Sequence, residues 1–73
     1  MALFQITNRT SGLDMGTYEA DNFRESLDVM AYDAGYSDYA DACRAIGQEP
    51  ADIVADGSHF WDAGDLRIEH IES

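Results

Sequence analysis

The sequence predicts an α+β domain in which two or three helices pack on one face of an antiparallel sheet of about four strands. Apolar and polar residues alternate near both ends of the chain, as they do in half-buried strands. In the middle, apolar residues recur at the spacing of an amphipathic helix, and glycines separate the segments. A chain of 73 residues is too short for two domains, so we expect one compact domain over residues 1–73.

The first predicted element is a hairpin. Ala2 to Asn8 alternate in a way that places Phe4 and Ile6 on one face of a strand. A stretch rich in turn residues covers positions 8–16, and Thr17 to Ala20 then form a second strand. The long loop that joins the two strands is a candidate contact surface.

Two helices are predicted to follow the hairpin. Asn22 and Glu25 have the spacing of a capping box at the start of the first helix, and Gly35 provides its C-terminal stop. Ser37 is expected to cap a second helix, which ends at Gly47. The apolar positions that define the buried stripes are Phe23, Leu27, Met30, Ala31 and Ala34 in the first helix, and Tyr39, Cys43 and Ile46 in the second.

The last third of the chain is predicted to close the domain with a second hairpin. Pro50 suits the first turn of a short third helix that stops at Gly57, and a strand over Asp52 to Ala55 stays open as the alternative. Ser58 to Trp61 and Leu66 to Ile71 have the composition and alternation of strands, and a tight turn joins them.

The charge of the chain excludes several classes of partner. Fifteen Asp and Glu residues face four Arg and no Lys, which gives a formal net charge of -11. Binding to nucleic-acid phosphates or to an anionic membrane surface requires clustered basic residues, and here the four arginines are scattered among acids. We therefore expect no direct contact with nucleic acid and none with a membrane.

The sequence also favours a soluble, cytoplasmic protein. The first ten residues lack the basic and apolar regions of a leader peptide, and no apolar stretch approaches the length of a membrane span. The single cysteine, Cys43, cannot form an intramolecular disulfide, and its place on an apolar helix stripe predicts a buried structural thiol.

No residue pattern typical of catalysis or cofactor binding is present. His59 and His70 are considered as metal ligands together with Asp52, Asp56 or Asp62, but their spacing matches no known set of metal ligands. No calcium-binding loop of the EF-hand type is found. We expect no catalytic residues, no metal and no cofactor. A metal-responsive or enzymatic domain that acts through the two histidines is the least favoured alternative.

The acidic residues of the two helices form the candidate partner-binding surface. Glu25 and Asp28 lie about 4.5 Å apart along a helix axis, and a row from Asp21 to Asp33 spans about 18 Å. Phosphates of a nucleic-acid strand repeat about every 3.4 Å, so such a row could fill Lys and Arg positions meant for a phosphate backbone. The predicted contacts are five acids and three aromatic anchors: Glu25, Asp28, Asp33, Asp38 and Asp41, with Tyr32, Tyr36 and Trp61.

In size, acidity and lack of catalytic motifs, the chain resembles the small phage-borne inhibitors of bacterial defence, the anti-CRISPR and anti-restriction proteins, several of which mimic nucleic acid. The resemblance is one of composition, so no site residue is carried over. It implies an inhibitor that occupies the Lys/Arg-rich nucleic-acid channel of a CRISPR or other defence complex. Two alternatives stay open. One is an accessory or regulatory interaction module that uses an aromatic hairpin around Phe60 and Trp61. The other is an acidic domain adapted to salt, without mimicry.

Overall fold

The computed structural model describes residues 1–72 and has an α+β fold, as the sequence predicts. Ser73, the last residue of the predicted domain, lies outside the described residues. Seven elements follow one another along the described chain: β1 (Ala2–Asn8), β2 (Asp14–Ala20), α1 (Phe23–Asp33), α2 (Tyr39–Ala45), β3 (Ile53–Ala55), β4 (Phe60–Ala63) and β5 (Leu66–Glu72).

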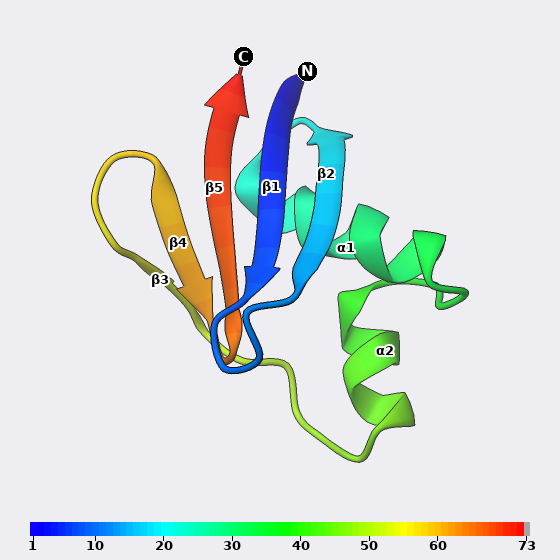
Figure 1. Cartoon of the computed structure of the whole chain (residues 1–73). Coiled ribbons are helices and arrows are strands. Elements are labelled where there is room, and N and C mark those ends of the chain that lie inside the picture. Colours follow the sequence, from blue (N-terminus) through cyan, green and yellow to red (C-terminus); the bar gives the residue numbers. More distant parts are fainter. Residues whose placement is uncertain (73) are drawn as a thin grey trace.

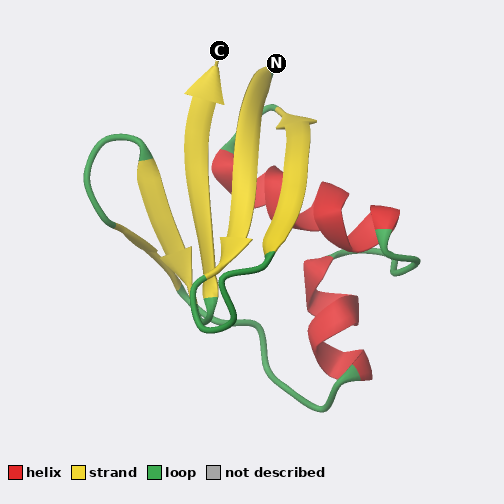
Figure 2. Ribbon diagram, in the orientation of Figure 1, coloured by secondary structure: helices red, strands yellow, loops and turns green. Residues whose placement is uncertain are grey.

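The five strands form one antiparallel sheet in the order β2-β1-β5-β4-β3. The first and last strands of the described chain are therefore neighbours in the middle of the sheet, and the marked ends of the chain lie at the same edge of the molecule (Figure 1). Helix α1 crosses one face behind β1 and β2, and α2 continues beside the sheet (Figure 2). The opposite face, which is turned toward the viewer, carries no helix. We call it the open face.

The hydrophobic core lies between α1 and the covered face of the sheet. Phe4 and Ile6 are buried, with exposed fractions of 3% and 0%, and this confirms that the two residues share an inward face. Leu27 from α1 packs against Ile68 of β5, and both are fully enclosed. A small core of this kind depends on each side chain, because the chain buries little more than about 60% of the surface that its unfolded form exposes.

The predicted third helix is absent from the described residues, and its alternative, a strand, is present. Ile53 to Ala55 form β3, which pairs with β4 through Val54 and Asp62. Two β-branched residues in a segment this short cannot support a helix, whose first turn is costly to nucleate, whereas an edge strand obtains its hydrogen bonds from a neighbour that is already in place. The sheet consequently has five strands rather than about four.

The start of the second strand and the cap of the second helix also differ from the predictions. Strand β2 begins at Asp14 rather than Thr17, because a bulge opposite Ile6 and Thr7 lets the hairpin pairing continue through Gly16. Gly16 has φ of 118°, a conformation that L side chains rarely adopt. Helix α2 is capped by Asp38 rather than Ser37.

Candidate protein-binding surface

The first acidic residues of the candidate surface are held by the N-terminus of α1. The side-chain oxygen of Asn22 accepts a hydrogen bond from the backbone N–H of Glu25 at 2.9 Å. The Glu25 carboxylate in turn accepts a hydrogen bond from the backbone N–H of Asp21 at 3.2 Å. The bond from Glu25 to Asn22 is the predicted half of a capping box, whereas the return bond comes from Asp21 rather than from the cap residue Asn22. This return bond fixes the direction of the Glu25 side chain.

Three further carboxylates hold the junction between α1 and α2. Asp38 accepts a hydrogen bond from the backbone N–H of Asp41 at 2.8 Å, and Asp41 accepts one from the N–H of Ser37 at 3.1 Å. Asp28 reaches from α1 to accept a hydrogen bond from the N–H of Tyr39 at 3.0 Å. The first turn of α2 is therefore held by carboxylates from both helices.

These backbone hydrogen bonds leave part of each carboxylate available. Within residues 1–72, one oxygen of Glu25, of Asp28 and of Asp38 accepts no hydrogen bond. Asp41 has an ion pair with Arg44 at 3.8 Å, and both side chains are largely solvated. Such an exposed pair contributes little, so the acids of this region remain a net negative surface. We call the set Glu25, Asp28, Asp38 and Asp41 the capping acids.

Tyr32, Tyr36 and Asp41 come together at the end of α1. With Gly35 and Ser37 they line a hollow of about 470 Å³. Tyr32 is 74% exposed, so its ring is available to a partner. Asp33 is also exposed, and the described residues provide it with no ion-pair or hydrogen-bond partner. Three of the eight predicted contact residues, Tyr32, Tyr36 and Asp41, therefore line the same hollow.

Trp61 is not part of that hollow. Its ring stacks on Phe23 with centroids 4.4 Å apart and an angle of 10° between planes, and it meets Phe4 edge-on at 6.2 Å. Because successive residues of a strand point to opposite faces, Phe60 lies on the open face while Trp61 lies on the covered face. The two aromatic residues of the predicted hairpin anchor therefore do not form a single patch.

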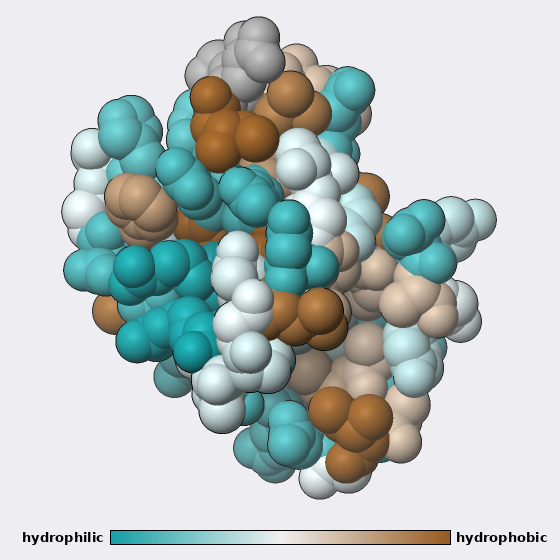
Figure 3. Space-filling view, viewed as in Figure 1, coloured by the Kyte–Doolittle hydropathy of each residue, from teal (hydrophilic) through white to brown (hydrophobic). Residues whose placement is uncertain are grey.

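The open face contains an ion-pair network that the sequence analysis missed. Arg67 donates hydrogen bonds to Asp62 at 3.0 Å and to Asp56, and Arg9 lies 3.5 Å from Asp62. The hydrogen bond from Arg67 and its positive charge hold the pKa of Asp62 below its ordinary value of 3.8. Hydrophilic surface covers β4 and the adjoining part of β5 in Figure 3.

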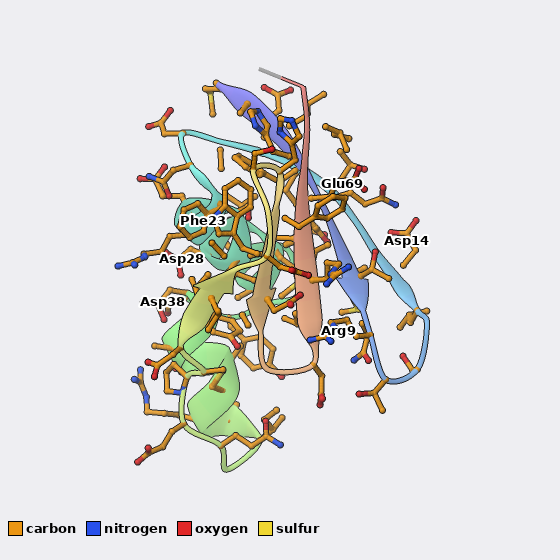
Figure 4. The ribbon with its side chains drawn as sticks, turned by 90° about the vertical axis from the view of Figure 1, so that its left-hand side faces the viewer. Arg9, Asp14, Phe23, Asp28, Asp38 and Glu69 are labelled. Carbon is orange, nitrogen blue, oxygen red and sulfur yellow. The ribbon has the colours of Figure 1, made fainter. Side chains whose placement is uncertain are left out.

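The sequence could have revealed this network through the residues that face each other on neighbouring strands. Asp62 and Arg67 are opposite each other at the two-residue turn of the closing hairpin, so a register built outward from Gly64 would have matched them. The side view in Figure 4 shows Arg9, Asp14 and Glu69 on one side of the sheet and Asp28 and Asp38 on the other.

A separate pocket lies where α1 begins, and the sequence analysis missed it as well. Its volume is about 460 Å³, and its lining includes Phe4, Phe23, Trp61, His70 and Asp21. His70 stacks on Phe4 at 5.1 Å between ring centroids. No spacing along the chain reveals this pocket, because its residues come from three strands and the start of a helix.

The two histidines considered as metal ligands lie near each other, with ring centroids 6.2 Å apart. Asp56 and Asp62, two of the acids considered with them, are bound to Arg67 instead. In the part of the chain that the structure describes, no group of three His, Cys, Asp or Glu side chains is arranged to hold a metal ion. None of its helices is long and apolar enough to cross a membrane.

Comparison with known proteins gives no family to which this surface can be related. No protein-family model, no curated protein sequence and no solved structure matches the chain.

Proposed function

We propose that this protein is a small acidic inhibitor that binds another protein by occupying a basic, nucleic-acid-binding surface, as in a CRISPR or other defence complex. The capping acids are the main contacts, together with Asp33 and the exposed ring of Tyr32. The target is a protein rich in Lys and Arg, and no catalysis, metal or cofactor takes part.

One observation carries this proposal: the capping acids are held in place before any partner arrives. Each accepts a hydrogen bond from a backbone N–H, so its side chain has already lost most of its rotational freedom. Binding is weakened by the entropy lost when flexible side chains are ordered, at about 0.5–1.5 kcal/mol for each. A preorganised set of carboxylates avoids much of that cost when it meets the Lys and Arg side chains of a phosphate-binding surface.

Charge distribution supports the same surface. Arg9 and Arg67 are engaged on the open face, whereas Arg24 and Arg44 are the only basic residues on α1 and α2. The helix side therefore keeps an excess of negative charge that can steer a basic partner toward it. On the open face, by contrast, Asp56 and Asp62 are paired with Arg9 and Arg67, and the acids there without an ion pair among residues 1–72 include Asp14 and Glu69.

The test is displacement of fluorescent target DNA from a purified CRISPR interference complex. In the test variant, Asn or Gln replaces all four capping acids (Glu25→Gln, Asp28→Asn, Asp38→Asn, Asp41→Asn). The amide oxygen still accepts the backbone hydrogen bond, so the caps are kept and only the charge is removed. We expect the wild-type protein to displace DNA at low salt and the variant to be at least about 10-fold weaker, or about 1.4 kcal/mol.

The matched control neutralises four acids outside the helix side (Asp14→Asn, Glu19→Gln, Asp65→Asn, Glu69→Gln). It changes the net charge equally but should displace DNA nearly as well as the wild type. Equal loss in both variants would show that only total charge matters. Displacement that is insensitive to ionic strength would contradict mimicry, since contacts with a phosphate-binding channel weaken as salt rises.

The aromatic-hairpin alternative has less support. It requires Phe60 and Trp61 to meet one partner together, and the two rings lie on opposite faces of the sheet. A variant such as Trp61→Ala would also disturb the stack with Phe23, so loss of binding in that variant would not by itself favour the alternative.

A further inference from the structure

We propose that the aromatic pocket at the start of α1 binds an arginine side chain of the basic partner. The pocket is the 460 Å³ hollow lined by Phe4, Phe23, Trp61, His70 and Asp21. This inference rests on the proposed function, because it names the group of the partner that is recognised and the place where it enters. The pocket lies at the start of α1, where Glu25 is the nearby capping acid, and away from Asp28, Asp38 and Asp41 at the junction of the two helices.

The aromatic walls are suited to a flat cation. Phe23 and Trp61 form one parallel stack and Phe4 and His70 form another, and the two stacks meet edge to face through Phe4 and Trp61. The faces of aromatic rings carry negative potential and attract cations, with Trp the strongest. A guanidinium group is planar and weakly hydrated, so it stacks on such a ring with a smaller desolvation cost than a lysine ammonium group.

Asp21 provides the charge that selects a cation. Its side chain is exposed at the pocket and has no hydrogen-bond or ion-pair partner among residues 1–72, although its backbone N–H is bound to Glu25. A free carboxylate beside an aromatic wall can accept two parallel hydrogen bonds from guanidinium while the ring covers the face of the same group. A lysine side chain offers no such planar match.

The N-terminus of α1 does not turn the pocket into an anion site. A helix N-terminus carries a partial positive charge and unpaired N–H groups, which favour anions. Here Asn22 and Glu25 already accept hydrogen bonds at this end, and the carboxylates of Glu25 and Asp21 outweigh the partial charge of the helix. An arriving anion would meet two negative charges.

The open face provides an internal example of the same contact. The guanidinium carbon of Arg67 lies 5.4 Å from the centroid of the Phe60 ring, and Arg67 binds Asp62 at the same time. This combination of one ring and one carboxylate around a guanidinium group is the arrangement that the pocket offers to an incoming arginine. The protein's own Arg24 does not line the pocket, although it follows Phe23 directly.

The only tryptophan of the chain lies in the pocket, which allows a direct measurement. Blocked arginine (N-acetyl-arginine methylamide) is titrated into the protein while the fluorescence of Trp61 is recorded at constant ionic strength. The control ligand is the citrulline analogue, which has the same shape but an uncharged urea group. We expect arginine to change the emission with saturation in the millimolar range, and citrulline to bind at least about 5-fold more weakly.

Three variants locate the effect. Asp21→Asn should weaken arginine binding about 3-fold to 5-fold, the loss expected for one exposed charge pair. Asp65→Asn removes the same charge from the turn between β4 and β5, outside the pocket, and should leave arginine binding unchanged. Trp61→Phe keeps an aromatic stack with Phe23 but provides a weaker cation site, and NMR shifts of His70 should then report weaker binding.

Equal binding of arginine and citrulline, or equal losses in Asp21→Asn and Asp65→Asn, would overturn the proposal. An unchanged Trp61 emission would overturn it as well. The outcome is independent of the DNA-displacement test. If the protein displaces DNA but its pocket ignores arginine, the proposed function stands without this inference. If arginine binds and no DNA is displaced, the pocket stands and the inhibitor proposal fails.

Discussion

The helix side and the open face of the sheet use the same residue type in opposite ways. On the open face, Asp56 and Asp62 are paired with Arg67 and Arg9, so charge is compensated across strands. On the helix side, Asp28 and Asp38 accept hydrogen bonds from backbone N–H groups, which carry no net charge. A carboxylate bound to an N–H is ordered but still negative. The number of acidic residues by itself therefore does not identify a binding surface. What matters is whether each carboxylate is bonded to an arginine or to a backbone N–H group.

The largest expected effect is the loss of stability caused by a substitution in the core between α1 and the sheet. Leu27→Ala removes a fully buried side chain from α1 and leaves a cavity against the covered face of the sheet, at a cost of about 2–5 kcal/mol. Small domains are stable by only about 5–15 kcal/mol, so the variant should be largely unfolded at moderate urea. Urea titration followed by Trp61 fluorescence measures this. Leu27→Met, which nearly conserves volume, is the control and should lose less than about 1.5 kcal/mol. Equal losses would argue against tight packing of α1.

A smaller loss of stability is expected when a helix-side acid can no longer accept its backbone hydrogen bond. Asp28→Ala leaves the backbone N–H of Tyr39 without its acceptor and should destabilise the fold by about 1 kcal/mol. Asp28→Asn keeps an accepting oxygen and should cost only a few tenths of a kcal/mol. Chemical denaturation of both variants in one buffer gives the comparison. Comparable losses would mean that the charge of Asp28, rather than its hydrogen bond, stabilises the start of α2.

The ion-pair network of the open face should respond to acid. Arg67 lowers the pKa of Asp62, so ionised Asp62 stabilises the folded state above the ordinary value of 3.8, and this contribution is lost as pH falls through the lowered pKa. Arg67→Gln should therefore lower the free energy of unfolding at neutral pH, and its difference from the wild type should shrink in acid. Urea denaturation across this pH range measures both curves. A difference that stays constant would mean that Arg67 stabilises the sheet mainly by its packing on Phe60.

The smallest expected effect is that of salt on stability. The uncompensated acids of the helix side repel one another, so moderate NaCl should raise the melting temperature slightly, by screening. The variant without charge on the capping acids should show a weaker dependence, whereas the control without charge on Asp14, Glu19, Asp65 and Glu69 should keep most of it. Folding only at molar salt would favour the salt-adapted domain over the inhibitor. An equal salt response of the two variants would remove the distinction between the regions.

Structural features that depend on residues close together along the chain could be predicted from the sequence. The alternation of Phe4 and Ile6 and the hydrogen bond from Glu25 to the cap residue Asn22 depend on neighbours a few residues away, and both are present. The segment around Ile53 could not be assigned, because three residues form a strand only if β4 is beside them. Asp38 replaced Ser37 as the cap for a related reason: both can accept the hydrogen bond, and the path of the chain between the helices decides which one does.

By itself, the sequence determined the α+β class, the net charge of -11 and the order of the main elements. These follow from composition, from periodicity and from contacts within a few residues. Only the tertiary structure decided which acids are neutralised by arginine, that Phe60 and Trp61 face apart, and that Asp21 lies beside four rings from distant segments. The physical reason is that these features depend on strand register and helix docking, which bring together residues as far apart along the chain as Phe4 and His70, beyond the reach of any local pattern.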